Sequence, residues 1–155
     1  KGDRIDVAFM RPYFQDEQLR IERVLDESLW VALASGHALA GRKSVSIKAL
    51  ANEPFVTANM RPGPSMFGLV MSICEKAGFH PKVAQAATDI QSVIGLVAAG
   101  IGCSIVPDSL TGLMVHGVRY VRLRDVPERA GIVMASRKND RSEVLKKFLE
   151  VARRM

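Results

Sequence analysis

Segments with two different patterns of apolar residues alternate along the chain. Short runs of apolar residues predict buried strands, and segments with apolar residues three and four positions apart predict helices. The predicted strands cover residues 5–10, 29–33, 55–58, 82–86, 103–106, 119–123 and 132–135. Because strands and helical segments alternate, the pattern predicts an α/β chain with a mostly parallel sheet covered on both faces.

Each predicted helix starts where a side chain can accept from free backbone N–H groups, or where a proline has no N–H to satisfy. The starts are Ser46, Pro64 or a neighbour, Thr88 or Asp89, Asp108 or Ser109, and Ser142. The spacing predicts buried faces made of Phe67, Val70, Met71, Cys74 and Ala77 in the second helix, Ile90, Val93, Ile94, Val97 and Ala98 in the third, and Val144, Leu145, Phe148, Leu149 and Ala152 in the last.

The stretch TDIQSVIGLVAAGIGCSIVP, residues 88–107, organises this pattern. Its helix is predicted to end in a tight turn at Gly100 and Gly102, because glycine takes positive φ at little cost. A buried strand follows, and Pro107 stops it. A helix laid on a sheet with a free N-terminus is the local geometry of an α/β ligand cleft.

The composition is that of a soluble globular protein. The chain has 155 residues, 48% hydrophobic and 25% charged, enough for one domain or two small lobes. No apolar run approaches the ~20 residues of a membrane span, and no signal-peptide pattern is present. Two cysteines do not make a disulfide framework, so we expect a cytoplasmic protein with no membrane partner.

The net charge of +6 is spread along the chain. The densest basic cluster, within residues 137–154, coincides with an amphipathic helix and is either a solvated helix face or a phosphate-binding patch. No helix-turn-helix, zinc-knuckle or aromatic-plus-basic motif accompanies it. We therefore do not expect this chain to bind DNA itself.

Few residues offer catalytic chemistry. His37, His80 and His116 share no metal-ligand spacing, and no nucleophile-elbow, phosphate-loop or zinc-protease motif is present. Cys103 follows a glycine turn and is the better nucleophile candidate of the two cysteines, but it lies in a predicted buried strand without an evident base. The sequence predicts no enzyme, cofactor or metal site; a small thiol enzyme is the alternative.

One predicted helix start favours an anion. Arg61, Pro64 and Ser65 lie where exposed N–H groups and the positive end of the helix dipole would attract a carboxylate, or they form only a well-capped helix start. Arg11 follows the end of a strand, the edge where ligands bind in open α/β sheets. Arg11 is either a ligand contact or an exposed residue in a turn.

The helix start at residue 88 carries Asp89 and Gln91. Asp89 either caps the helix or contacts a ligand, and Gln91 points to ligand or to solvent. Because the Asp89 carboxylate opposes an anion, the preferred anion site is at residues 64–66. The predicted ligand is a small aromatic or unsaturated mono- or dicarboxylate.

Six short motifs occur in a fixed order along the chain. They are GDRIDVAFMRP at residues 2–12, VALASGHALA at 31–40, EPFV at 53–56, CEKAGFHPKVAQ at 74–85, IGLVAAGIGCSIVP at 94–107 and VRYVRL at 118–123. Together they resemble the effector-binding (substrate-binding) domain of LysR-type transcriptional regulators. Each motif alone is weakly specific, but the ordered set spans nearly the whole chain. The family's usual GHPLA reads GHALA here, with Ala38 in place of proline.

The resemblance implies the two-lobed, periplasmic-binding-protein-like (type 2) fold, with three-layer α/β/α lobes joined by two crossing strands. Carried over, lobe I comprises residues 1–31 and 123–155, lobe II comprises residues 32–122, and the crossings are residues 29–33 and 119–123. In the family a DNA-binding helix-turn-helix domain and the first βα units of lobe I precede this point. Lobe I is therefore expected to be incomplete.

The resemblance also implies a site and a role. In the family, the positions of Pro64, Ser65 and Met66 hold the effector's carboxylate, often with an aromatic residue where Met66 stands; in some members an acidic residue at the Asp89 position faces an arginine at the Arg11 position. The expected role is to bind a small organic acid effector between the lobes. The parent homodimer or homo-oligomer would contact DNA through its helix-turn-helix domain. A stand-alone solute-binding receptor of the same fold is the alternative.

Overall fold

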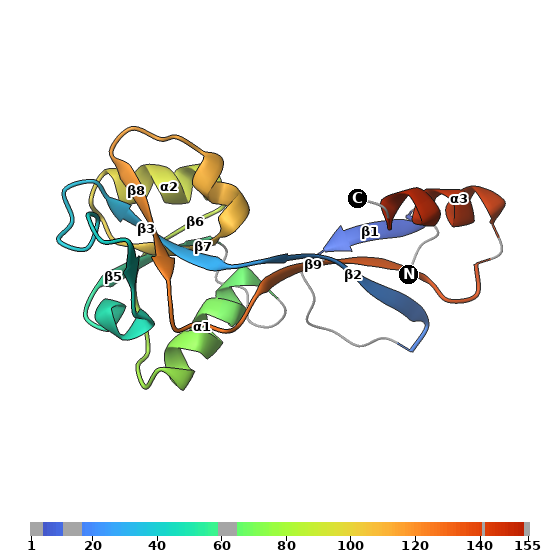
Figure 1. Ribbon diagram of the computed structural model, residues 1–155, viewed down its shortest axis with the longest axis horizontal. Helices are drawn as coiled ribbons and strands as arrows, with labels where there is room; N and C mark the ends of the chain where they lie inside the picture. Colours follow the sequence, from blue (N-terminus) through green and yellow to red (C-terminus); the bar gives the residue numbers. More distant parts are fainter. Residues whose placement is uncertain (1–4, 11–16, 59–64, 141, 154–155) are drawn as a thin grey trace. The chain divides into compact units, whose positions relative to one another are not determined.

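The computed structural model describes residues 5–10, 17–58, 65–140 and 142–153 (Figure 1). The chain forms two compact units, Lys1–Asp26 with Gly131–Met155, and Glu27–Ala130. The two segments predicted to cross between lobes, residues 29–33 and 119–123, both lie inside the second unit and pair with each other there. The chain passes into the second unit between residues 26 and 27 and leaves it between residues 130 and 131.

The first unit is built on a three-stranded sheet. Its strands are β1 (Val7–Met10), β9 (Ala130–Arg137) and β2 (Leu19–Glu27), in that order across the sheet. β1 runs antiparallel to β9. β2 was not predicted, because its polar and apolar residues mix without a clean alternation and its start falls in a stretch that reads as a polar loop.

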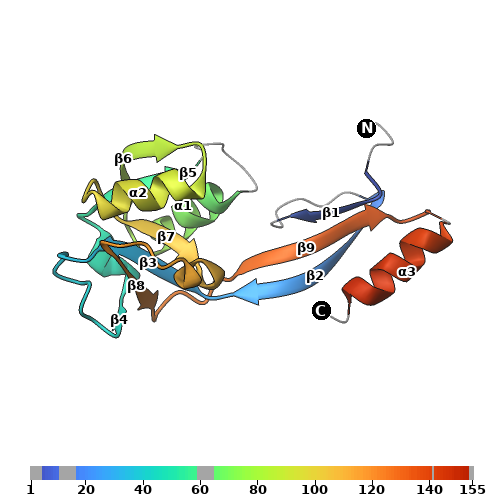
Figure 2. The ribbon, with the colours of Figure 1, turned by 90° about the horizontal axis from the view of Figure 1, so that it is seen from above.

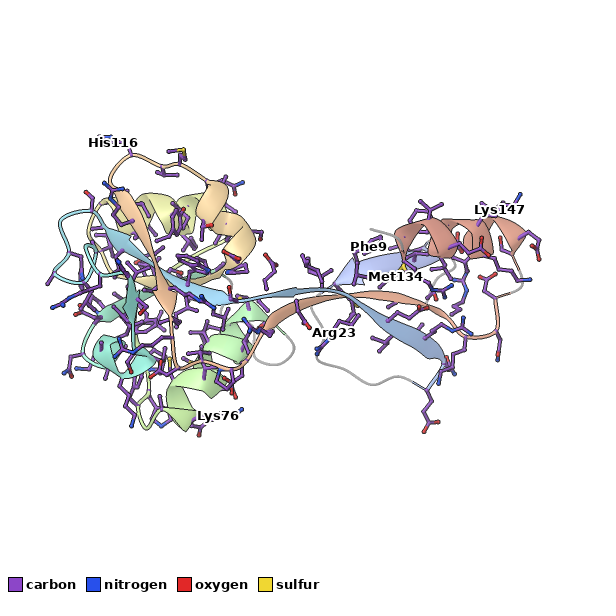
Figure 3. All side chains as sticks on the ribbon, in the orientation of Figure 1. Phe9, Arg23, Lys76, His116, Met134 and Lys147 are labelled. Carbon is purple, nitrogen blue, oxygen red and sulfur yellow. The ribbon has the colours of Figure 1, made fainter. Side chains whose placement is uncertain are left out.

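Helix α3 (Glu143–Ala152) packs on this sheet and begins, as predicted, after Ser142. Its buried residues are Leu145, Leu149 and Ala152, which form a cluster with Met134 of β9 (Figure 3). Val144 and Phe148, predicted to be buried, are 79% and 47% exposed. The prediction was wrong for these two because the apolar stripe of the helix is wider than its contact with the sheet.

The second unit holds a four-stranded and a two-stranded sheet. The first has the order β4 (Ser44–Val45), β8 (Val118–Leu123), β3 (Leu29–Ala34) and β7 (Ser104–Pro107); the second pairs β5 (Pro54–Ala58) with β6 (Lys82–Ala87). β3 is antiparallel to β7 and β8, whereas β4–β8 and β5–β6 are parallel. The sheets are mixed, not mostly parallel, because β3 carries the chain into this unit and β8 carries it back.

Helices cover both faces of the four-stranded sheet, which makes three layers. Alternate residues of β3 point to opposite faces. Leu29, Val31 and Leu33 join the core under α1 (Met66–Lys76), whereas Ala32 joins the core under α2 (Ile90–Ala98). Figure 1 shows the two helices on opposite sides of the strands, and Figure 2 looks down on α2. α2 buries Val93, Ile94 and Val97 as predicted, whereas Ile90 and Ala98 of the predicted face are only partly buried. Gly78 follows α1 with φ +91°.

The two glycines after α2 serve different purposes. Gly100 has the predicted positive φ, +78°, but Gly102 does not. A Cβ on Gly102 would lie 2.9 Å from the carbonyl carbon of Pro54. Glycine is needed there because the neighbouring Cys103 bonds to β5, donating its N–H to Pro54 O and accepting from Val56 N–H, both at 2.8 Å. These bonds join the two sheets.

Two short 3₁₀ helices complete the second unit, η1 (Ile47–Leu50) and η2 (Asp108–Gly112). Ser46 caps η1 as predicted. The predicted capping of η2 by Asp108 or Ser109 was wrong, since its N-cap residue is Pro107 and the carboxylate of Glu27 binds the Ser109 N–H instead. Within the described ranges, no helix is both long and apolar enough to cross a membrane.

Candidate functional site

A small cavity of about 40 Å³ lies in the second unit between β5 and the first turns of α1. Its wall is apolar except for the hydroxyl-bearing residues Thr57 and Ser104. The lining residues are Phe55, Val56, Thr57 and Ala58 of β5, Met66, Phe67, Val70 and Met71 of α1, and Pro81, Val83, Ile90, Ser104 and Ile105. The cavity thus touches the first residue of both α1 and α2.

The N-terminus of α1 has a neutral cap and N–H donors that bond to no other described residue. Ser65 Oγ accepts from the N–H of Gly68 at 3.1 Å, and Ser65 O accepts from the N–H of Leu69 at 3.1 Å. The N–H groups of Met66 and Phe67 bond to no other described residue. These two donors and the positive end of the helix dipole therefore lie at the start of α1, where the capping side chain carries no charge.

The N-terminus of α2 is capped by a carboxylate. Asp89 Oδ1 accepts from the N–H of Ser92 at 2.8 Å, and Oδ2 accepts from the Ser92 hydroxyl at 2.9 Å and from Thr88 Oγ1 at 3.2 Å. These hydrogen bonds, the backbone one first, lower the pKa of Asp89 below its usual value. A second anion at this helix start would meet a carboxylate that stays charged at neutral pH.

The structure describes four of the seven predicted site residues; Arg11, Arg61 and Pro64 lie outside the described residues. Ser65 caps α1 and Met66 lines the cavity. Asp89 has the capping role that was one of its two predicted alternatives. Gln91 is exposed and does not line the cavity.

Of the residues that line the cavity, the sequence analysis predicted only Met66 as a site residue. Phe67 and Met71 were predicted to be buried, but the core face of α1 is Leu69, Val70, Ile73 and Cys74, so both are only half-buried beside the cavity. Ser104 and Thr57 lie in strands whose apolar neighbours dominate the pattern. Ser104 could have been recognised as a site candidate because it is the only hydroxyl-bearing residue in an otherwise apolar strand. Burying a hydroxyl without a hydrogen-bond partner costs free energy.

Neither cysteine has the environment of a nucleophile. Cys103 is 2% exposed and Cys74 is fully buried. Burial raises the pKa of each thiol to about 12, so both are protonated at neutral pH. In the part of the chain that the structure describes, no three His, Cys, Asp or Glu side chains gather where they could hold a metal ion.

Known protein sequences are similar to this chain. The model of the LysR substrate binding domain family matches residues 1–155. The HTH-type transcriptional regulator AlsR of Bacillus subtilis (strain 168) is 34% identical over 152 residues, covering 98% of this chain and 50% of AlsR. TtuA of Agrobacterium vitis, another HTH-type transcriptional regulator, is 39% identical over 124 residues, covering 79% of this chain and 41% of TtuA.

Solved structures agree with these matches. The BenM effector binding domain with its effector benzoate has a TM-score of 0.87 at 30% identity, covering 97% of this chain and 69% of that one. The effector binding domain of QuiR in complex with shikimate has a TM-score of 0.85 at 22% identity, covering 98% and 72%, and shows the fold alone. The fold is periplasmic-binding-protein-like, type 2.

The chain spans about half the length of the curated relatives it matches. The family match extends over every residue, and relatives at 30% identity or more accompany it. The chain therefore belongs to the LysR substrate-binding domain family.

Proposed function

We propose that this chain is the ligand-sensing part of a LysR-type transcriptional regulator and binds a small organic carboxylate at the N-terminus of α1. The lobes would close around this effector, and closure would control DNA-dependent transcription through the helix-turn-helix domain of a dimeric or oligomeric parent protein. The single observation that carries the ligand class is the pair of N–H donors on Met66 and Phe67, which bond to no other described residue and lie beside a cavity with an apolar wall.

The two helix starts at the cavity have opposite electrostatic character. A carboxylate at α1 would take charge-assisted hydrogen bonds from Met66 and Phe67, each contributing roughly 1.5–3 kcal/mol. The same group at α2 would approach the Asp89 carboxylate, which already accepts the Ser92 N–H. The contrast favours the α1 start.

The similar proteins support an acid as the ligand class. BenM's effector binding domain, at 30% identity, is described with its effector benzoate, which carries one carboxylate on a six-membered ring. The curated relatives named above are transcriptional regulators, which favours a regulatory role over that of a transport receptor or a thiol enzyme.

The decisive experiment places a charge at the cap of α1 without removing the cap. Ser65→Asp and Ser65→Asn both retain an N-cap acceptor, but only aspartate adds the negative charge that Asp89 supplies at α2. Thermal unfolding would be measured with benzoate, shikimate, fumarate and succinate. A ligand at a hundred times its Kd stabilises the fold by about 2.7 kcal/mol, which raises Tm by roughly 5–10 °C at this chain length.

We expect at least one acid to raise the Tm of the wild-type chain and of Ser65→Asn, and we expect this rise to vanish in Ser65→Asp. The Tm without ligand should be similar in the two variants, since both caps are favourable. An equal rise in both variants, or no rise with any acid, would show that the α1 start is not the carboxylate site.

A further inference from the structure

Ser104 is a buried serine whose hydroxyl bonds to no residue that the structure describes. The residue, in β7, is 4% exposed and lines the cavity next to α1. Its hydroxyl makes no hydrogen bond to the rest of the described chain. Among the described residues, no fully buried side-chain N or O atom lacks a partner. The Ser104 hydroxyl must therefore keep a little accessible surface, and the cavity that Ser104 lines is where that surface is reached.

An apolar residue would suit the packing of β7 better than serine. The neighbours of Ser104 along the strand, Ile105 and Val106, are buried, and its cross-strand partner Ala32 is fully buried. Burying a hydroxyl without a hydrogen bond costs roughly 1–3 kcal/mol in proteins. Because no described residue supplies this hydrogen bond, the partner is water or another polar group that enters the cavity.

The cavity limits what that group can be. Its volume of about 40 Å³ has room for only a few groups the size of a water molecule. The half-buried side chains of Met66 and Phe67 form one wall, and the N–H donors of the same two residues begin the helix. A ligand whose carboxylate occupies the helix start can therefore extend only a small substituent toward Ser104.

We propose that Ser104 is a specificity-determining residue, which hydrogen-bonds a hydroxyl or keto oxygen carried by the carboxylate ligand. The ligand class is then a small hydroxy- or oxo-acid with an apolar body, and not the unsubstituted acid. This inference rests on the proposed function, since it takes the α1 N-terminus as the carboxylate site. The Ser104 hydroxyl can donate to a keto oxygen or both donate to and accept from a hydroxyl.

The test compares pairs of acids that differ by one oxygen: benzoate with 3- and 4-hydroxybenzoate, succinate with malate, and butanoate with 3-hydroxybutanoate. Kd would be measured by calorimetry for the wild-type chain, Ser104→Ala and the matched control Thr57→Val, which removes the other hydroxyl of the cavity wall. Because the Ser104 hydroxyl bonds to no residue that the structure describes, Ser104→Ala should not lower the unliganded Tm.

We expect the wild-type chain to bind the oxygenated member of at least one pair more tightly, by roughly three- to tenfold. Ser104→Ala should reduce that ratio to about one while leaving the Kd of the unsubstituted acid unchanged, and Thr57→Val should preserve the ratio. If acids bind and the ratio survives in Ser104→Ala, or if no pair shows a preference, the role of Ser104 is overturned and the carboxylate site stands. If no acid binds the wild-type chain, both proposals fail.

Discussion

The carboxylate of Glu27 accepts a hydrogen bond from the backbone N–H of Ser109 at 2.8 Å, across 82 residues of sequence. Glu27 ends β2 and is 6% exposed. Ser109 lies in the first turn of η2, whose N-cap residue Pro107 supplies no side-chain acceptor. The adjacent Asp108 N–H donates to Ser28 O at 3.0 Å. Two consecutive residues at the start of the second unit thus hold the beginning of η2.

Replacing Glu27 should therefore destabilise the second unit. Glu27→Ala leaves the Ser109 N–H without its acceptor, and we expect a loss of about 1–3 kcal/mol in the free energy of unfolding. Glu27→Gln keeps an oxygen that can accept, so its loss should be smaller. Urea unfolding measures both. Glu143→Ala, which removes an exposed pair with Lys146 and a carboxylate in the first turn of α3, is the control and should change stability by less than about 1 kcal/mol. Equal effects at Glu27 and Glu143 would contradict the capping role.

Gly102 should not tolerate a methyl group. In Gly102→Ala the new Cβ would meet the Pro54 carbonyl, which is held by the Cys103 N–H, so the two sheets must separate locally. We expect a loss of about 1–3 kcal/mol, the usual cost of overpacking. Gly95→Ala is the matched control, since Gly95 lies inside α2 with open space around it. It should gain about 0.5–1 kcal/mol through helix propensity. Similar urea midpoints for the two variants would exclude the close-approach explanation.

Asp125 should make stability depend on pH in the acid range. Burial raises its pKa, but hydrogen bonds from the Ser46 hydroxyl and the Ile47 N–H outweigh burial and hold the pKa below the usual value. A carboxylate whose pKa is lower in the folded state than in the unfolded state stabilises the fold at pH values above the unfolded-state pKa of about 3.9. This stabilisation is lost as the pH falls through the folded-state pKa. Urea midpoints from pH 7 down to 3 should therefore fall less steeply in Asp125→Asn than in the wild-type chain.

Part of the acid dependence should remain in Asp125→Asn. Hydrogen bonds from Lys76 and Arg153 lower the pKa of Glu128 and Glu22, respectively, so these carboxylates lose their contributions over the same range. Identical pH profiles for the wild-type chain and Asp125→Asn would show that the Ser46 and Ile47 bonds do not favour the charged carboxylate.

The outer face of α3 should make this 155-residue chain associate. Val144 is 79% and Val151 64% exposed, and half-exposed Phe148 contacts Phe9 of β1 with ring centroids 6.4 Å apart (Figure 3). An apolar patch of this kind favours contact with another molecule. We expect light scattering at micromolar concentration to show dimers or larger species.

The double variant Val144→Lys with Val151→Lys should shift the population toward monomer, because both side chains are exposed and the core contacts of Leu145 and Leu149 remain. Ile101→Lys, which alters an exposed apolar residue of the second unit, should leave the distribution unchanged. A wild-type chain that is monomeric throughout this concentration range would refute the expected association.

Helix starts were predictable from the sequence because capping is local. Ser46, Asp89 and Ser142 each accept from a backbone N–H two or three residues later, so residue type and spacing suffice to identify them. The same holds for the positive φ of Gly100 and for the buried face of α2. Family motifs that extend over the chain added the two-lobed fold, which no local pattern contains.

Features that depend on distant partners were decided only by the tertiary structure. The cap of η2 comes from Glu27, the need for Gly102 comes from Pro54, and the antiparallel pairing of β3 with β8 depends on where the chain enters and leaves the second unit. Packing also decided which residues of α1 are buried, and it left Phe67 beside the cavity. Ser104, in β7, lines the same cavity. A one-dimensional pattern records the polarity of each residue, whereas a cavity exists only where separate elements fail to fill the space between them.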